Sequence, residues 1–494
     1  MRTRSTVHLG RAALIAPVAL VIAAGVISGS SAGARPEAPA VTAAHHPAWT
    51  QISSGTQLGL SQPAVARFGK DYEAVWVQKV TPSSFAIRAR ILDAAGHPKG
   101  GVIDVLDNWS ELSLDPTILS AGGQRVIAFA GQRVQSPDPY NTDAEYYLTS
   151  SDGKHWSLQS DVLSPAGAGT DVGTAVAAYS TGFLTGLARS GQVEYYLGPS
   201  SQDPPSSFSG STDSTGNGTS EPGVAVAGNK AWFAWYSDTN SASQNGVSAQ
   251  QVLPTKGPRL HAAASHSGIT SYGAQQDLSL VARTGSTDAP YTAFGAPPAH
   301  QAVVVWQIGA SKPLLHISSP GFHTVSLAAG PKGRLWVVWQ DTKGWHATRS
   351  NRSATRFEPI SRVSLPASSG VGDLASVGSA GPLEAISEQT PYKTGHTLVY
   401  AHLFRPRLSC SASPSKVKPG QSFTVKVTDA GDAVPSATVH ALGAKKKTTR
   451  SGKAKLRMPR HGASTAHITV SLAGYVGCSA TVRVKGASGA AWAQ

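Results

Sequence analysis

The sequence predicts an all-β protein. Gly and Pro are abundant, with 51 and 32 residues among 494, as a chain of strands and turns requires. One hairpin pattern recurs along the chain: a strand of small residues, a turn with Gly, and a strand of apolar or aromatic residues. No stretch of any length shows the 3.6-residue periodicity of an amphipathic helix.

Seven copies of this pattern follow one another at spacings near fifty residues. They begin at Pro63, Pro116, Thr174, Pro222, Leu278, Ser326 and Leu374. A third strand-like run often follows each copy, as in AIRARILD and HTLVYAHL, and weaker fourth runs occur in places. Four short strands per repeat are typical of a β-propeller blade. The sequence therefore predicts a seven-bladed β-propeller, with six blades and an insert as the alternative because the third and fifth repeats are ragged.

The segment from Pro47 to Gly55 has the pattern of an outer strand without a blade of its own. We expect it to complete the last blade and close the ring. Bulky rings on the second strands are expected to pack between blades: Trp76, Trp232, Trp235, Trp336 and Trp339. Trp109 and Trp345 fall in expected loops, where they are candidate sugar-stacking platforms.

Ser150 to Trp156 reads SSDGKHW and is similar to the Asp-box, the S-x-D-x-G-x-T-W turn of sialidase-like (BNR) propellers. It is one residue shorter between Asp and Trp, and it lies between the third and fourth strands of a repeat, as in that family. The resemblance implies a folding element away from the active face. Its turn residues are Ser150, Asp152, Gly153 and Trp156, with Asp152 expected to accept bonds from backbone N–H groups.

A sialidase would also need an arginine cluster, a Tyr nucleophile activated by Glu, and an acidic proton donor. Arg88 and Arg90 are the nearest arginine candidates. Tyr72–Glu73 and Glu145–Tyr146 are adjacent in sequence, but adjacent strand residues point to opposite faces. The sequence therefore weighs against sialidase catalysis.

The N-terminal segment predicts export. Three arginines precede an apolar run from Ala12 to Ile27, and small residues end in Ala32-Gly33-Ala34. This order is that of a secretory signal peptide, with an uncleaved anchor helix as the alternative. We expect a signal peptide at 1–34, a lead-in at 35–46, the propeller at 47–404, a second domain at 405–486 and a tail at 487–494. No later run is long and apolar enough to cross a bilayer.

From Leu408 the composition shifts to Ser, Val, Thr and Lys. The order SATVHAL, TTRSGKAKLRM, HITVSLAGY resembles the prealbumin-like and bacterial Ig-like modules of surface proteins. The resemblance implies a small Ig-like β-sandwich. Cys410 and Cys478 are the only cysteines, and in an exported chain they are expected to form one disulfide, with free buried thiols as the alternative.

The net charge of +14 is concentrated in this segment, where fifteen Lys or Arg between Arg405 and Lys485 face two acids. Eight basic residues form a patch within sixteen positions: Lys445, Lys446, Lys447, Arg450, Lys453, Lys455, Arg457 and Arg460. Such a field predicts contact with an anionic envelope polymer or glycan, while a merely soluble surface that keeps sheet edges apart is the alternative. No nucleic-acid partner is expected, because interleaved aromatics are absent.

No catalytic motif, metal-binding pattern or cofactor fingerprint is present in the sequence, so we expect no cofactor and no metal. The calcium-loop rhythm from Asp213 has Val224 where the ligand Glu is required. Five carboxylates are expected just before the first strands of repeats, where they are candidates to bind a cation or a polyol at the mouth of the propeller channel: Asp115, Asp171, Glu221, Asp277 and Asp373. Capping of their own turns is the alternative.

These observations favour, without deciding, a secreted non-enzymatic propeller for binding or display at the cell envelope. The alternative is a sialidase-like glycoside hydrolase acting on extracellular glycans, since other glycosidases need only two suitably spaced carboxylates. The oligomeric state does not follow from the sequence.

Overall fold

The structure is a computed structural model. It describes residues 49–485 except 54–56, 61–62, 82, 113–115, 134–143, 161–162, 164–173, 181, 190–191, 199–207, 214–218, 238–245, 263–277, 297–301, 320–323, 365–375, 381–382, 390–395 and 462–463. Its contacts divide the chain into two units, 1–46 and 47–494. The expected signal peptide, lead-in and tail lie outside the described residues.

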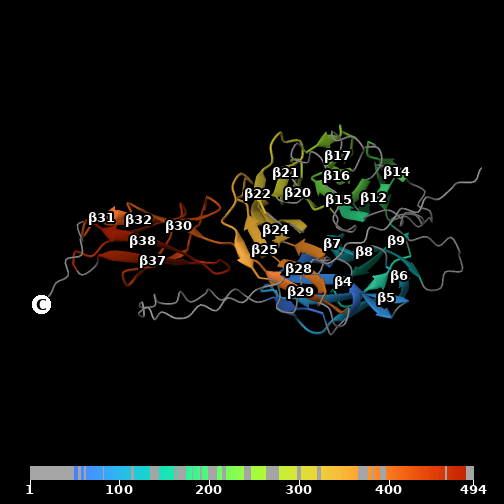
Figure 1. Cartoon of the computed structure of the whole chain (residues 1–494), viewed down its shortest axis with the longest axis horizontal. Helices are drawn as coiled ribbons and strands as arrows, with labels where there is room; N and C mark the ends of the chain where they lie inside the picture. Colours follow the sequence, from blue (N-terminus) through green and yellow to red (C-terminus); the bar gives the residue numbers. More distant parts are fainter. Residues whose placement is uncertain are drawn as a thin grey trace, which may run out of the picture. The chain divides into compact units, whose positions relative to one another are not determined.

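Four antiparallel sheets of four strands each follow one another in the middle of the chain, and within each the strands pair in sequence order (Figure 1). The first contains β11 (Thr174–Tyr179), β12 (Gly182–Arg189), β13 (Gln192–Gly198) and β14 (Phe208–Ser211). The second contains β15 (Thr219–Ala227), β16 (Lys230–Ser237), β17 (Gly246–Leu253) and β18 (Leu260–His261). The third contains β19 (Leu280–Val281), β20 (Tyr291–Ala296), β21 (Ala302–Gln307) and β22 (Leu315–Ser318). The fourth contains β23 (Thr324–Ala329), β24 (Leu335–Asp341), β25 (Gly344–Arg349) and β26 (Ser361–Val363), with a short 3-10 helix at Pro331–Gly333.

The remaining strands of this region pair laterally into one larger sheet. Within it, consecutive strands of each repeat again pair with one another. It contains β1 (Thr50–Gln51), β2 (Gln57–Leu60), β3 (Ala64–Phe68), β4 (Asp71–Thr81), β5 (Ser84–Leu92), β6 (Ile103–Glu111), β7 (Thr117–Ala121), β8 (Gln124–Arg133), β9 (Ala144–Ser150), β10 (Ser157–Leu158), β27 (Ser376–Ala380), β28 (Leu383–Gln389) and β29 (His396–Leu403). β1 pairs antiparallel with β29, with Thr50 opposite Ala401. The N-terminal strand thus pairs with the last strand of the repeats, which is the pairing expected for the segment from Pro47 to Gly55.

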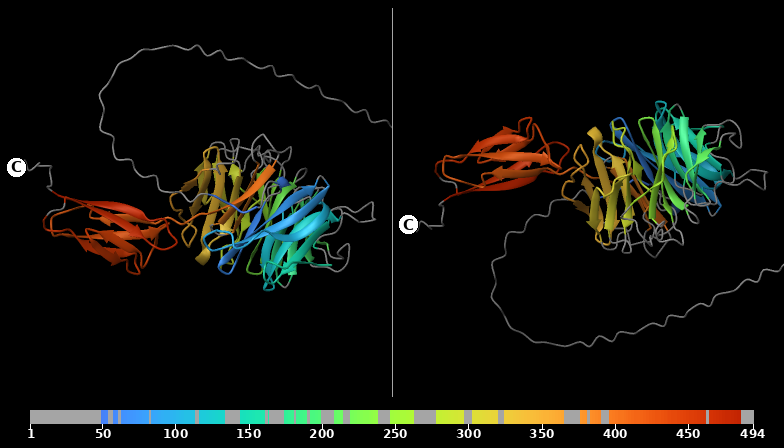
Figure 2. Two further views of the ribbon diagram at one scale, coloured as in Figure 1. Left: turned by 90° about the horizontal axis from the view of Figure 1, so that it is seen from below. Right: turned by 90° about the horizontal axis from the view of Figure 1, so that it is seen from above.

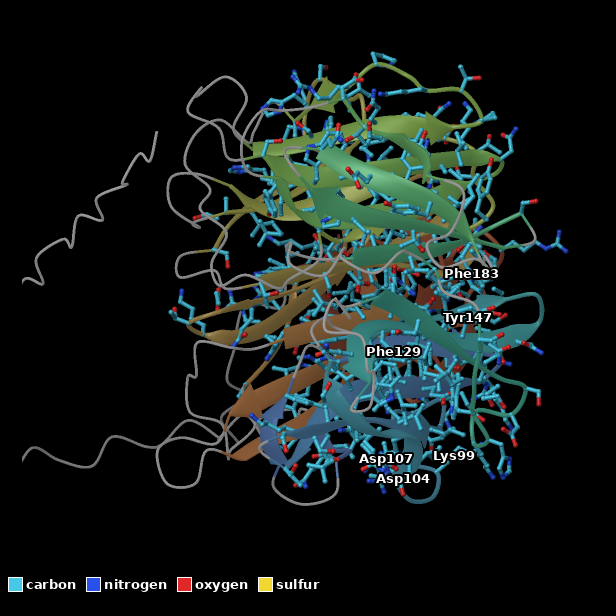
Figure 3. All side chains as sticks on the ribbon, turned by 90° about the vertical axis from the view of Figure 1, so that its right-hand side faces the viewer. Lys99, Asp104, Asp107, Phe129, Tyr147 and Phe183 are labelled. Atoms are coloured by element: carbon cyan, nitrogen blue, oxygen red, sulfur yellow. A yellow bond between two sulfur atoms is a disulfide. The ribbon has the colours of Figure 1, made fainter. Side chains whose placement is uncertain are left out.

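The first strands of the repeats contact one another in chain order: β3, β7, β11, β15, β19, β23 and β27, and β27 in turn contacts β3. Apolar side chains fill the space between successive sheets. Tyr147 of β9 and Phe183 of β12 meet across one such boundary, with ring centroids 5.3 Å apart (Figure 3). The described residues therefore form an all-β, propeller-like fold without an α-helix.

The tryptophans expected between blades are buried on second strands, as the sequence predicts. Trp232 of β16 packs with Phe294 and Trp306 of the next sheet. Trp76 of β4 shares a cluster with Ile52 and with Val399 of β29, so one cluster spans both ends of the repeat region.

The C-terminal strands form two separate sheets, drawn as two layers in orange and red in Figure 2. One contains β30 (Ser409–Ser413), β32 (Ser422–Asp429), β33 (Asp432–Ala433) and β36 (Lys453–Arg457). The other has the order β31 (Lys416–Val417), β38 (Cys478–Val484), β37 (Thr465–Ser471), β34 (Thr438–Ala441) and β35 (Ala444–Lys447). Alternating residues such as Phe423, Val425, Val439 and Ile468 build the core between them.

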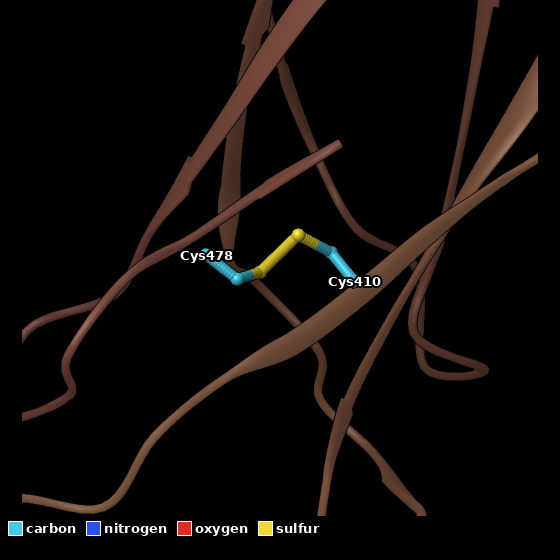
Figure 4. Close-up of a disulfide and its surroundings, with 2 residues drawn as sticks. All are labelled: Cys410 and Cys478. Atoms are coloured by element: carbon cyan, nitrogen blue, oxygen red, sulfur yellow. A yellow bond between two sulfur atoms is a disulfide. The ribbon is translucent and has the colours of Figure 1, made fainter. Parts of the chain in front are cut away.

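The expected disulfide is present and joins Cys410 of β30 to Cys478 of β38 (Figure 4). Because these strands belong to different sheets, the bond links the two layers of the C-terminal region.

Candidate functional site

The structure does not describe the side chains of the candidate carboxylates of the channel mouth. Asp115, Asp171, Asp277 and Asp373 lie outside the described residues, and of Glu221 only the backbone in β15 is described. The structure does describe the strands that follow the four aspartates. These strands, β7, β11, β19 and β27, begin two or three residues after each aspartate. These strands belong to the contacting ring of first strands. Four antiparallel strands return the chain to the end where it started, so successive first strands begin at the same end of this ring.

The turn that resembles an Asp-box is held by its own side chains. Ser150 Oγ accepts a hydrogen bond from the Gly153 N–H at 2.8 Å. Asp152 Oδ1 accepts bonds from the N–H groups of Lys154 at 2.8 Å and His155 at 3.0 Å. The His155 bond, followed by the Lys154 bond, holds the pKa of Asp152 well below its usual range. This carboxylate is therefore engaged in shaping its turn.

Gly153 is required at this turn for two reasons. Its φ of +75° lies in the left-handed region that favours glycine. A Cβ at this position would also collide with the side chain of Arg125 and would lie 2.7 Å from Glu73 Oε2. Trp156 Nε1 donates to the Gly153 carbonyl at 3.3 Å. The turn thus closes over an ion pair that the sequence did not reveal.

That ion pair joins β4 to β8. Arg125 Nη1 donates to Glu73 Oε2 at 2.5 Å, and the Glu73 side chain is fully buried. Burial raises the pKa of Glu73 to about 7, although the bond from Arg125 opposes the shift. A carboxyl group with no exposed surface is out of reach of a substrate, so we assign this pair to packing between neighbouring repeats.

The Tyr–Glu pairs do not form a sialidase nucleophile. Tyr72 is buried in the apolar cluster that contains Trp76 and Val399, whereas its neighbour Glu73 pairs with Arg125. Glu145 is 1% exposed, and the ring of Tyr146 packs edge-on against Trp109 at 5.0 Å. Buried neighbours on opposite faces of a strand cannot act together on one substrate.

The nearest arginine candidates are also engaged. Arg88 pairs with Asp104 at 3.2 Å and with Asp107 at 2.7 Å, two acids labelled at the rim of the sheets in Figure 3. Arg90 donates to the carbonyls of Ile52 at 2.8 Å and Gly100 at 2.9 Å. Neither is left to form a cluster that would bind a substrate carboxylate.

The prediction that Trp109 and Trp345 are exposed stacking platforms is wrong. Trp109 lies in β6 at 3% exposure and packs against Phe129, with ring centroids 5.1 Å apart. Trp345 lies in β25, is fully buried and contacts Trp49. Both rings lie in strands where loops were expected, so their apolar surface packs in the core.

A buried ionic cluster joins the sheet β23–β26 to the C-terminal sandwich. Arg349 donates to Asp429 Oδ2 at 2.5 Å, and the Tyr475 hydroxyl donates to the same oxygen at 3.1 Å. Arg334 lies 3.2 Å from Asp429 and 2.6 Å from Asp432. The two arginines are 80 or more residues from their acidic partners in sequence, so no local pattern could have indicated these pairs.

Burial acts on this cluster in two ways. Burial is the largest influence on Arg349 and opposes its charge, but Asp429, the Tyr475 hydroxyl and Glu358 together outweigh burial and raise the pKa of Arg349. Glu358 is 4% exposed and accepts the Arg407 N–H at 3.0 Å. Burial raises the pKa of Glu358 to about 7, with Arg349 opposing.

The eight residues of the basic patch are all exposed. Several of them line a groove of about 680 Å³ on the sandwich, between the β34–β35 hairpin and the end of β36. This groove, which we call the basic groove, is lined by Ser422, Ala441, Leu442, Ala444, Lys445, Lys446, Lys455, Leu456, Arg457, Met458, Pro459 and Arg460.

Among the described residues, no three His, Cys, Asp or Glu side chains gather in a way that could hold a metal ion. Asp213, the start of the calcium-like rhythm, instead pairs with Lys256 at 2.8 Å. Across the same residues, no helix has the length and apolar character needed to cross a bilayer.

No protein-family model and no curated protein matches the chain. Among solved structures, an arabinanase of Bacillus subtilis aligns at 9% identity and TM-score 0.32, covering 71% of this chain and 96% of its own. An exo-β-1,3-galactanase of Phanerochaete chrysosporium aligns at 11% identity and TM-score 0.32, covering 74% and 92%. A lectin of Aleuria aurantia, solved with α-methyl-L-fucoside, aligns at 10% identity and TM-score 0.34, covering 83% and 99%.

These comparisons correct one expectation. The sequence favoured a non-enzymatic protein for binding or display, whereas several of the similar structures are glycoside hydrolases, so that expectation is withdrawn. At identities of 9 to 11% the likeness transfers no site residue to this chain.

Proposed function

We propose that the protein is an exported glycoside hydrolase that acts on extracellular glycans. The observation that carries the proposal is the contacting ring of first strands, because it gathers the starts of β7, β11, β15, β19 and β27 at one end. The sequence places a carboxylate within three residues before four of these strands and another inside β15. Glycoside hydrolysis needs two carboxyl groups about 5 to 10 Å apart, and five carboxylates next to these strand starts would supply candidates for such a pair.

The catalytic pair would work without a Tyr nucleophile. The Tyr–Glu pairs are buried and Arg88 and Arg90 are engaged, so a sialidase mechanism has no support among the described side chains. Two carboxylates acting as acid and as base or nucleophile need no further residue type. The proposal therefore takes the general glycosidase route rather than the one the Asp-box resemblance implied.

The finer architecture belongs to the same proposal. We infer seven blades, because seven first strands contact one another in order, and ring closure by β1 against β29. We also infer that the C-terminal region is an Ig-like sandwich, supported by its two sheets around one core. The signal-like N-terminus supports export.

A panel of aryl glycosides and plain polysaccharides incubated with the mature chain tests the function. Asp115→Asn, Asp171→Asn, Glu221→Gln, Asp277→Asn and Asp373→Asn are made one at a time. Turnover is expected for at least one substrate, with kcat falling by about 10²- to 10⁴-fold in two of the five variants. Asp104→Asn is the matched control, because this carboxylate is exposed and pairs with Arg88. Absence of turnover on every substrate, or turnover that none of the five variants lowers, would refute the proposal.

A further inference from the structure

The basic groove has two walls because the edge strands of both sheets meet there. β35 ends one sheet and β36 ends the other. Lys446 lies opposite Val439, a buried residue, so Lys446 points to the inner side of its sheet. Its Nζ reaches across and donates to the Lys455 carbonyl at 2.9 Å. A side chain of one sheet thus spans to the backbone of the other and holds the two edges close together.

The charge of the groove is all of one sign. Lys445, Lys446, Lys455, Arg457 and Arg460 line it, and no acidic residue does. The only acids between 405 and 485, Asp429 and Asp432, are both paired with arginines of the preceding sheets. Asp429 ends β32 and Asp432 begins β33, whereas the groove is lined by Ser422 at the start of β32. A concave surface lined by one sign of charge concentrates the field and attracts counter-ions.

The floor of the groove is apolar but contains no aromatic ring. Leu456 and Met458 contribute to it from the edge of the sandwich core, and both are buried. No Trp, Tyr, Phe or His lines the groove. Stacking of bases on aromatic side chains, which gives single-stranded nucleic acid much of its affinity, is therefore not available.

We propose that the basic groove binds one chain of an acidic polysaccharide, with carboxylate groups along the chain paired to the lysines of both walls. A single sugar chain is narrow enough to enter between two edge strands, and its C–H surfaces can lie on the apolar floor. A bilayer presents its charges in a plane and reaches only the rim. A neutral sugar would find no stacking platform. This site stands independently of the proposed hydrolase activity, because its readout is binding.

The test compares two triple variants of the full mature chain, each losing three positive charges. The groove variant carries Lys445→Gln, Lys455→Gln and Arg460→Gln. The control variant carries Lys416→Gln, Lys418→Gln and Lys485→Gln, which are exposed residues outside the groove. Lys416 lies on β31, the opposite edge of the sheet that contains β35. Thermal melting first shows that both variants fold.

Polygalacturonate binding is measured by calorimetry at 0.15 M salt, with neutral dextran, duplex DNA and phosphatidylglycerol vesicles as comparison ligands. The groove variant is expected to lose about tenfold in Kd for polygalacturonate, equivalent to about 1.4 kcal/mol, while the control variant changes less than twofold. Binding should weaken in both proteins at 0.5 M salt, because exposed charges are screened. An equal loss in the two variants would show a general field and refute the groove. Tighter binding to DNA or vesicles than to polygalacturonate would refute the choice of occupant.

Discussion

The propeller-like region and the C-terminal sandwich are closed in different ways. In the first, the two-residue strand β1 pairs with β29, and Ile52 packs with Trp76 and Val399 across the ends of the repeats. In the second, a disulfide links the two sheets around a core dominated by aliphatic side chains. The propeller-like region is closed by strand pairing and packing that are lost when β1 detaches. The sandwich is closed by a covalent bond. The comparison predicts that the two regions respond to different perturbations.

The regions also differ in where they keep charge. The repeats bury an ion pair between neighbouring repeats of the larger sheet, Glu73 of β4 with Arg125 of β8. The sandwich keeps its basic residues exposed and gives its two acids to Arg334 and Arg349. Charge in the repeats thus contributes to packing, whereas charge in the sandwich is left available to a partner.

The largest effect is expected from removing the closing strand. Deleting residues 47–53 removes the β1 pairing, the buried Ile52 and the Ser53 hydroxyl that accepts the Val399 N–H at 3.0 Å. Loss of a buried Ile side chain alone costs about 2 to 5 kcal/mol, so a total above about 5 kcal/mol is expected. Calorimetric melting should show the propeller transition lowered and the sandwich transition unchanged. Gln51→Ala is the control within the same strand, because Gln51 is exposed. An unchanged melting curve for the deletion would contradict closure by β1.

A smaller loss of stability, confined to the C-terminal sandwich, is expected from Cys410→Ser combined with Cys478→Ser. The disulfide closes a loop with a sequence separation of 68 residues, and constraining such a loop contributes roughly 4 kcal/mol in the chain-entropy model. The melting temperature of the sandwich should fall, while the melting temperature of the propeller-like region stays unchanged. If both transitions fell together, the two regions would share one cooperative unit and the comparison would fail.

The smallest effect is expected at Glu358, where the two regions meet. Burial raises the pKa of Glu358 to about 7 in the folded protein, above its ordinary value of 4.5, so folding favours the protonated form. Stability from this group is therefore present below pH 4.5 and is lost as the pH rises through 7. Glu358→Gln should remove this loss and raise stability at pH 8 by on the order of 1 to 3 kcal/mol.

Denaturant titrations from pH 5 to pH 8 measure this effect. Glu73 has the same pKa, so the variant should keep the part of the pH dependence that Glu73 contributes. Asp104→Asn, at an exposed carboxylate, serves as the control. A pH dependence identical in the parent and in Glu358→Gln would contradict the assignment.

Much of the fold followed from the sequence, because local patterns carry it. Repeats of small-residue strand, Gly turn and aromatic strand predicted the sheets and the burial of tryptophans such as Trp235 and Trp339 on second strands. Two cysteines can form only one intramolecular disulfide. The Asp-box-like turn was readable because its hydrogen bonds run between residues within three positions of one another.

What the sequence by itself determined is therefore the set of strands, their all-β packing and the cysteine pair. The tertiary structure alone decided the contacts between distant positions. Trp345 was expected in an exposed loop, yet it lies in β25 and is buried beside Trp49. Arg349 and Asp429 meet although 80 residues separate them. The basic groove exists because two edge strands, β35 and β36, belong to different sheets that share a core. Alternation tells which residues share a face of one strand, but not which other strand that face meets, since packing of distant segments depends on the whole chain.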